Sequence, residues 1–283
     1  MALPPAVTRF AAARLGSIVD ALAAVGLHFT CYLRAIAAIP HVLGRHGRDV
    51  ARLVGEISLG SASLLAGGGT IGVVFAMSFV SSTQVGLEGH RGLDLLGLSP
   101  MTGLAAALVS TREIAPLVAS IALAAKVGTG FTAQLGAMRI SEEIDALEAM
   151  SVRSLPYLVS TRMVAAFLSV IPLYLVGLFA SYLATGVAVV YLNGVSEGTY
   201  NYYFRLVLTP EDVLFSLLKA VAFAIVVTLV HCAYGYYAAG GPEGVGKAAG
   251  RALRTSIVAI TIADVLLSIA FWGLRPTLPA LGI

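Results

Sequence analysis

Residues 126–150 read KVGTGFTAQLGAMRISEEIDALEAM, and they separate two long apolar segments in the middle of the chain. The second half of this stretch contains the densest acidic cluster of the sequence, formed by Glu142, Glu143, Asp145 and Glu148. A short acidic helix between two apolar segments is expected to lie in water at a membrane surface. On spacing alone, a solvated loop helix with no further role explains the stretch equally well.

We expect this acidic helix over about residues 139–150. Ser141 is a candidate N-cap, and Glu142 and Glu143 then fall in the first turn, where acidic side chains favour the helix dipole. A period of 3.6 residues divides the helix into an apolar face and an acidic face. The apolar face carries Ile140, Ile144 and Leu147, and the acidic face carries Glu142, Asp145 and Glu148.

The composition is that of an integral membrane protein. Of the 283 residues, 58% are hydrophobic and only 12% are charged, and the mean hydropathy is +0.89. Soluble domains carry about a quarter charged residues. The apolar runs are long and do not alternate with polar residues, which favours an all-α membrane protein over a β-barrel. The net charge of +3 is small and gives no indication of nucleic-acid binding.

Five spans of about 20 or more apolar residues are expected. They cover about residues 60–84, 101–127, 157–192, 211–237 and 253–274. Together they form one domain over residues 60–274, with loops at 85–100 and 193–209 and a short tail at 275–283. The second of these loops is rich in aromatic residues, which fit either a belt at the membrane interface or a docking surface for a partner.

The N-terminal segment, residues 1–59, is expected to form an interfacial amphipathic helix followed by a basic elbow. Between residues 8 and 40, polar residues such as Arg14, Asp20 and Arg34 fall on one arc of a helical wheel, opposite an apolar arc. Such a helix is typical of the membrane interface. The alternative is a true span, which would place a basic cluster outside the cell, against the positive-inside rule.

The placement of basic residues predicts the orientation. The segments assigned to the cytoplasm carry Arg9, Arg14, Arg34, Arg45, Arg48, Arg52, Lys126, Arg139, Arg153, Arg162, Lys247, Arg251 and Arg254. The segments assigned to the outside carry Arg91, Arg205 and Arg275. This asymmetry predicts a multi-pass protein of the cell membrane with a cytoplasmic N-terminus and an external C-terminus.

Four ionisable residues fall inside the expected spans: Arg112, Glu113, Lys219 and Asp264. A charged side chain in hydrocarbon costs a few kcal/mol on insertion scales, so each is expected to face the bundle interior and to have a partner. The expected pairs are Glu113 with Lys219 and Arg112 with Asp264. The group is either a structural network or a polar patch in an otherwise apolar cavity for a substrate.

No enzymatic site is evident in the sequence. Residues 241–247, GPEGVGK, fit the core of a phosphate-binding loop, but Ala248 follows where a magnesium-binding hydroxyl is needed. Cys31 and Cys232 lie far apart in apolar contexts and are expected to be free thiols. Neither a catalytic triad nor a metal-ligand spacing is present, so we expect a chain without a cofactor of its own.

Three motifs carry a resemblance to a known family: REIAP at residues 112–116, GTGFTAQLG at 128–136 and ISEEIDALE at 140–148. They resemble the MlaE/YrbE permeases, the membrane subunits of ABC-type transporters that work with lipid-carrying MCE proteins. The likeness extends from about residue 60 to residue 273. GLD at 92–94, HC at 231–232 and GGPEGVG at 240–246 are similar to the second YrbE paralogue of mycobacterial Mce complexes.

The resemblance implies a permease subunit that moves hydrophobic lipids such as fatty acids, mycolic acids or sterols. It implies a paralogous YrbE permease as heterodimer partner, MCE proteins on the outer face, and a separate ABC ATPase dimer that binds ATP and magnesium. The acidic helix corresponds to the coupling helix, which docks on that ATPase. Two other classes remain open: an ion-coupled secondary transporter that uses Glu113 and Asp264, and an intramembrane lipid-modifying enzyme.

Overall fold

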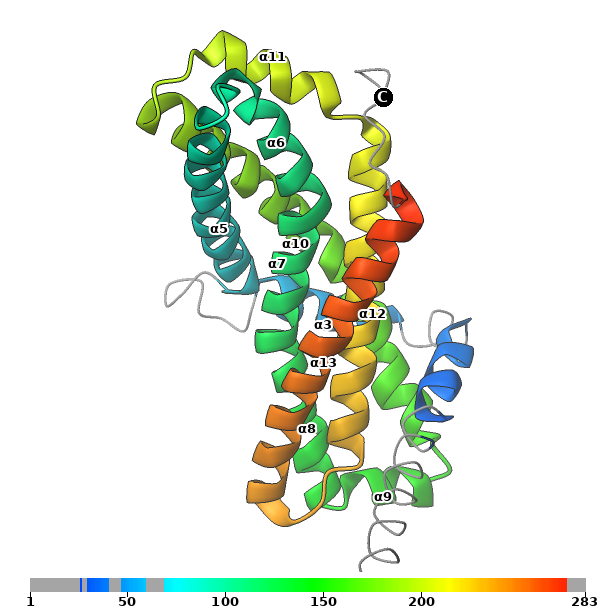
Figure 1. Cartoon of the computed structure of the whole chain (residues 1–283). Helices are drawn as coiled ribbons and strands as arrows, with labels where there is room; N and C mark the ends of the chain where they lie inside the picture. Colours follow the sequence, from blue (N-terminus) through cyan, green and yellow to red (C-terminus); the bar gives the residue numbers. More distant parts are fainter. Residues whose placement is uncertain (1–25, 27–29, 41–46, 60–68, 274–283) are drawn as a thin grey trace, which may run out of the picture.

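The structure, a computed structural model, describes residues 26, 30–40, 47–59 and 69–273 of the chain. These residues form helices joined by short connections, with no β-strand among them (Figure 1). Five helical segments in this part are long and apolar enough to cross a membrane: Gly69–Asp94, Ser99–Ile140, Pro156–Leu192, Pro210–Tyr236 and Gly241–Trp272. The expected all-α fold with five membrane-spanning segments is confirmed.

Several of these segments are subdivided by wider or tighter helical turns. The elements before the acidic helix are α3 (Gly47–Leu59), α5 (Gly69–Asp94), η1 (Ser99–Met101), α6 (Thr102–Val109), η2 (Ser110–Ile114), α7 (Ala115–Ala122), η3 (Leu123–Gly128) and α8 (Thr129–Ile140). The acidic helix is α9 (Glu143–Ala149). The remaining elements are η4 (Pro156–Ser160), α10 (Thr161–Gly186), η5 (Val187–Leu192), α11 (Glu197–Val207), α12 (Pro210–Tyr236) and α13 (Gly241–Trp272).

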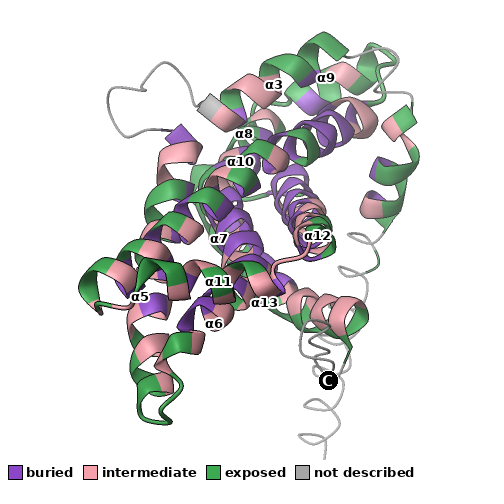
Figure 2. Ribbon diagram, turned by 90° about the horizontal axis from the view of Figure 1, so that it is seen from above, coloured by how far each residue is buried: buried purple, intermediate pink, exposed green. Residues whose placement is uncertain are grey.

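The helices form an elongated bundle with α11 across one end and α9 across the other, and these are called the α11 end and the α9 end below (Figure 1). Helix α10 packs against α5, α3, α7 and α12, and α12 packs in turn against α8 and α13. Buried residues concentrate in α7, α10 and α12, whereas α5 and α13 expose much of their surface (Figure 2). The protein core therefore follows α10 and α12 along the bundle.

His231 of α12 joins three helices in the core near the α9 end. The side chain is fully buried, and its Nδ1 lies 2.9 Å from Thr132 Oγ1 of α8 while its Nε2 lies 3.3 Å from Ser256 Oγ of α13. The close approach of α8 and α12 requires a glycine at Gly235, because a Cβ there would lie 2.9 Å from the backbone of Thr132. The polar contacts of His231 thus have a structural explanation, since they hold α8, α12 and α13 together.

The helices extend beyond the apolar runs at several places where we expected loops. Helix α5 continues to Asp94, so residues 85–94 are helical, and Arg91 and Glu88 form an ion pair at 2.8 Å within it. The second segment continues to Ile140, and residues 197–207 of the second expected loop form α11. Hydropathy marks the part of a helix that lies in hydrocarbon, whereas local polar contacts allow the helix itself to continue into water.

Helix α13 begins at Gly241, well before the expected span at 253. Gly240 takes a left-handed conformation with φ 91°, Pro242 lies in the first turn, and Lys247 pairs with Glu243 at 2.6 Å. Proline is favoured in a first helical turn because amide hydrogens at these positions have no acceptor within the helix, so proline loses no hydrogen bond there. The GPEGVGK segment is therefore helical, which excludes a phosphate-binding loop at this position.

The N-terminal expectation is covered only in part by the described residues. Residues 30–37 are helical, with Cys31 and Ala35 buried against the bundle while Leu33 and Ile36 are 54% and 45% exposed. Ser160 Oγ donates a hydrogen bond of 2.8 Å to the Ala35 carbonyl and ties this helix to the bundle. The structure does not describe residues 1–25, 27–29, 41–46, 60–68 and 274–283, and the interfacial helix and the external tail stay predictions there.

Candidate functional site

Two features of the structure correspond to the candidate residues: a charge network between η2, α12 and α13, and the acidic helix α9. The network lies where the second segment forms a wider, π-helical turn, η2, that contains Arg112 and Glu113. Such turns inside α-helices occur frequently at functional sites. Pro116 is the second residue after η2, and it lacks the amide hydrogen that would pair with the Arg112 carbonyl in an α-helix.

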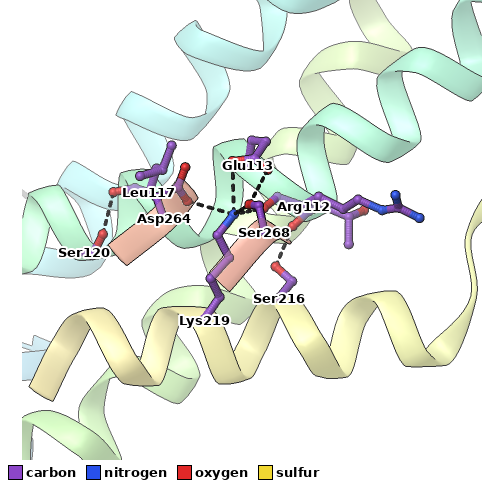
Figure 3. Close-up of polar contacts among 9 residues, drawn as sticks. Arg112, Glu113, Leu117, Ser120, Ser216, Lys219, Asp264 and Ser268 are labelled. Atoms are coloured by element: carbon purple, nitrogen blue, oxygen red, sulfur yellow. Dashed lines mark hydrogen bonds and ion pairs between the residues drawn. The ribbon is translucent and has the colours of Figure 1, made fainter. Parts of the chain in front are cut away.

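Lys219 of α12 satisfies this carbonyl and connects the three elements (Figure 3). Its side chain is fully buried, and Nζ donates hydrogen bonds to the Arg112 carbonyl at 2.8 Å, to Glu113 Oε2 at 3.0 Å and to Ser268 Oγ at 2.7 Å. Ser268 Oγ in turn donates to Glu113 Oε1 at 3.0 Å. The expected pairing of Glu113 with Lys219 is therefore present.

Asp264 also forms an ion pair with Lys219, so the expected pairing of Asp264 with Arg112 is wrong. Its Oδ1 lies 2.7 Å from Lys219 Nζ. The three N–H groups of the ammonium already point at other acceptors, and Oδ1 has an ion-pair contact but no hydrogen bond. One buried cation thus faces two carboxyl groups at this point of the bundle.

Arg112 pairs instead with Asp212, a residue in the first turn of α12. Arg112 Nε and Nη2 lie 3.0 Å and 2.9 Å from Asp212 Oδ1. Trp272 Nε1 donates to the same oxygen at 2.6 Å, and the Arg112 guanidinium lies 5.0 Å from the centre of the Trp272 ring. Thr209 caps α12 by accepting a bond from the Asp212 amide. Sequence reasoning missed Asp212 because a carboxylate in a first turn is usually explained by the helix dipole.

The network is partly open to its surroundings. The Glu113 side chain is 38% exposed, whereas Asp264 and Arg112 are each 14% exposed. A pocket beside Arg112 and Asp212 has an empty volume of about 140 Å³, which is small for a lipid. The arrangement holds η2, α12 and α13 together and presents one carboxylate at its edge. Both the structural and the substrate-contacting interpretation remain predictions.

The acidic helix α9 begins differently from the expectation. Its N-terminal flanking residue is Glu142, in a left-handed conformation with φ 60°, so the assignment of Ser141 as N-cap is wrong. Ser141 directly follows α8, and its hydroxyl oxygen lies 3.0 Å from both the Ala137 carbonyl oxygen and Glu143 Oε1, the two acceptors available to its one hydrogen. The chain turns between α8 and α9 at Ser141 and Glu142, which places Ile140 in α8.

The apolar face of α9 packs on the bundle. Ile144 is fully buried and Leu147 packs against the same core cluster, whereas Ile140 is 41% exposed. Burial of one large aliphatic side chain contributes roughly 1.5–3 kcal/mol. Ile144 therefore fixes α9 to the membrane domain and is not available to a partner.

The acidic face of α9 divides into anchored and free carboxylates. Asp145 pairs with Arg139 at 2.7 Å, and Glu148 accepts hydrogen bonds from Ser154 Oγ at 2.6 Å and Tyr236 Oη at 3.2 Å. The Ser154 bond, followed by the Tyr236 bond, holds the pKa of the Glu148 carboxyl below its usual range. Among the described residues, Glu142 has no side-chain partner. Glu143 accepts one bond from Ser141, and both side chains are exposed and can contact another protein.

No metal or cofactor site emerges from the described residues. Within these residues, no group of three or more His, Cys, Asp or Glu side chains is placed to hold a metal ion. Cys31 and Cys232 are buried and free, as expected.

Comparison with known proteins finds a family model that matches most of the chain and several related proteins. Residues 61–270 match the family model described as Permease MlaE. A probable ABC transporter permease protein of Rickettsia bellii is 30% identical over 71% of this chain and 77% of its own length. A probable ABC transporter permease protein of Rickettsia prowazekii is 29% identical over 83% of this chain and 98% of its own length. The chloroplastic protein TRIGALACTOSYLDIACYLGLYCEROL 1 of Arabidopsis thaliana is 29% identical over 72% of this chain and 55% of its own length.

Proposed function

The chain belongs to the MlaE permease family, and we propose that it is the membrane subunit of an MCE-associated ABC-type lipid transporter. It moves hydrophobic lipids between the plasma membrane and MCE proteins on the outer face. A separate ATPase dimer binds ATP and magnesium and supplies the energy. The name of the Arabidopsis relative refers to a galactolipid, which supports a lipid as the transported molecule.

The observation that carries the proposal is the arrangement of α9. Ile144 fixes one side of this helix to the bundle, while Glu142 and Glu143 point to solvent at the α9 end. The helix follows α8 after two residues, and residues 150–155 connect it to η4 and α10. A partner that binds Glu142 and Glu143 can therefore transmit a displacement into the two flanking membrane-spanning segments, Ser99–Ile140 and Pro156–Leu192.

We further propose a paralogous YrbE permease as heterodimer partner, with this chain as the second of the two paralogues. Helix α13 exposes a row of large apolar residues: Val258, Ile262 and Leu266 are 59%, 58% and 61% exposed. Such a row offers a surface to a second permease subunit. The transported lipid is a fatty acid, a mycolic acid or a sterol.

The α9 end is assigned to the cytoplasm and the α11 end to the outside. This orientation predicts that a cysteine introduced at Ser141 or at Gly246 reacts with a membrane-impermeant maleimide only from the cytoplasmic side. A cysteine introduced at Ser196, which precedes α11, should react only from the outside. Reaction of Ser141→Cys and Ser196→Cys from the same side would contradict the orientation.

Purification of the tagged chain from its native membrane tests the proposed function. We expect mass spectrometry to find an ABC ATPase, a second MlaE-type permease and MCE proteins with it. A second candidate function, an ion-coupled secondary transporter, is favoured by the second carboxyl group at Lys219. Purification without any ATPase, together with lipid transport driven by an ion gradient, would replace the first proposal by the second.

A further inference from the structure

A pocket of about 650 Å³ opens at the α9 end, between the helical residues 30–37, the connection from α9 to α10 and the end of α12. Arg34 contributes from the first of these elements, Arg153 from the second and Tyr237 from the third. The pocket lies far along the bundle from the charge network at Lys219, since α12 begins at the α11 end and finishes here (Figure 1). It is separate from the charge network, and it adjoins the acidic helix α9, whose Glu148 lines it.

The pocket has a positive balance of charge. Two guanidinium groups, Arg34 and Arg153, and one carboxylate, Glu148, line it. Among the described residues, neither Arg34 nor Arg153 has a hydrogen-bond or ion-pair partner for its side chain. The Glu148 carboxylate accepts bonds from Ser154 and Tyr236. A guanidinium group binds a phosphate through paired N–H groups, so two such groups without a protein partner suit an anionic ligand of this kind.

Exposed apolar residues lie next to both arginines in the chain. Leu33 and Ile36 flank Arg34 on the same short helix and are 54% and 45% exposed. Met150 and Val152 precede Arg153 and are 66% and 39% exposed. Of these residues only Val152 lines the pocket itself. Exposed large aliphatic side chains in this number are costly in water, so their presence beside the two arginines favours contact with acyl chains. Arginines beside exposed aliphatic residues are typical of the boundary between lipid headgroups and hydrocarbon.

We propose that this pocket binds the phosphate of a phospholipid headgroup at the membrane surface on the α9 side. Arg34 and Arg153 hold the phosphate, and the acyl chains lie along Leu33 and Ile36. A lipid bound in this way bridges the helix at residues 30–37, the α9–α10 connection and α12. The proposal concerns a resident lipid, and it stands whether or not the proposed transport function is correct.

Thermal unfolding of the full-length chain, purified in detergent with its partner subunits, tests the site. The probes are phosphatidylglycerol, diacylglycerol with the same acyl chains, and inorganic phosphate. We expect only phosphatidylglycerol to raise the midpoint of unfolding. Arg34→Gln with Arg153→Gln should lose most of this increase, with an apparent affinity at least about tenfold weaker for each charge-assisted contact removed. The matched control is Arg251→Gln with Arg254→Gln, two arginines of α13 that do not line the pocket, and it should keep the increase.

Each contrary result overturns the proposal in a recognisable way. An equal loss in the control pair would indicate non-specific attraction to anionic lipid, and a full response to inorganic phosphate would indicate a site for free phosphate. Loss of a partner protein from the Gln pair, with its lipid response intact, would indicate a protein-docking surface. If the Gln pair fails to fold, the single variants Arg34→Gln and Arg153→Gln are measured instead by native mass spectrometry. Retention of bound phospholipid at the wild-type level in both single variants would also refute the proposal.

Discussion

Lys219→Met is expected to lower the free energy of unfolding by about 3–5 kcal/mol, the range seen when one partner of a buried ion pair is removed. The variant keeps the volume of the side chain but removes the cation that faces Glu113 and Asp264. It also leaves the Arg112 carbonyl without its hydrogen bond, since Pro116 has no amide hydrogen to replace it. Denaturant or thermal unfolding in detergent micelles measures the loss.

Because Lys219 contacts both Glu113 and Asp264, the stability expected for a double variant differs from that of an isolated ion pair. If Glu113 and Lys219 formed an isolated pair, Glu113→Ala with Lys219→Ala would be milder than either single change. In the structure this double variant leaves Asp264 without its cation. We therefore expect recovery only in the triple variant Glu113→Gln, Lys219→Met and Asp264→Asn, which removes all three charges and keeps the shapes. Strictly additive losses across the series would show that the three side chains do not act together.

The overall fold could be predicted because long apolar runs have few solutions in a membrane. The segments Pro156–Leu192 and Pro210–Tyr236 coincide with the expected ranges 157–192 and 211–237. Proline marks the start of both segments and gives a local signal for the helix N-terminus. The C-terminal end of α5 and the N-terminal end of α13 differ from the expected ranges. Local ion pairs of Glu88 with Arg91 and of Lys247 with Glu243 allow these helices to extend beyond the apolar run.

The partners within the charge network could be predicted only in part. The cost of a buried charge requires a partner of opposite sign, and this requirement led to one correct pair, Glu113 with Lys219, and one wrong pair, Arg112 with Asp264. It does not determine that Lys219 takes Asp264 as well, or that Arg112 takes Asp212 at the start of α12. Those choices depend on the rotation of α12 and α13 about their axes, which the packing of neighbouring helices determines.

Glu142→Lys with Glu143→Lys is expected to abolish association with the ATPase while the membrane fold remains intact. Each exposed ion pair is typically worth under about 1 kcal/mol, so a single substitution should have a modest effect. The double reversal replaces attraction by repulsion at two adjacent points, and we expect binding to weaken more than tenfold. Reversal of the whole acidic face would be harder to interpret, because Asp145 and Glu148 bond to Arg139, Ser154 and Tyr236 and position α9 itself.

Two controls separate docking from folding in this experiment. Glu197→Lys makes the same change of charge in the first turn of α11, at the opposite end of the bundle, and should leave the ATPase bound. Ile144→Ala removes the buried contact of α9 and should lower stability by about 2–5 kcal/mol. A double-reversal variant that unfolds at the wild-type temperature but lacks the ATPase would therefore have lost a contact and not its fold.

The amount of ATPase that copurifies with Glu142→Lys, Glu143→Lys, relative to wild type and to Glu197→Lys, tests the central claim most directly. The claim is that this chain is a permease driven by a separate ATPase through α9. We predict that the ATPase is lost from the double-reversal variant while the second permease and the MCE proteins stay bound. Retention of the ATPase at the wild-type ratio, with lipid-stimulated ATP hydrolysis unchanged, would contradict the claim and make α9 an ordinary solvated helix.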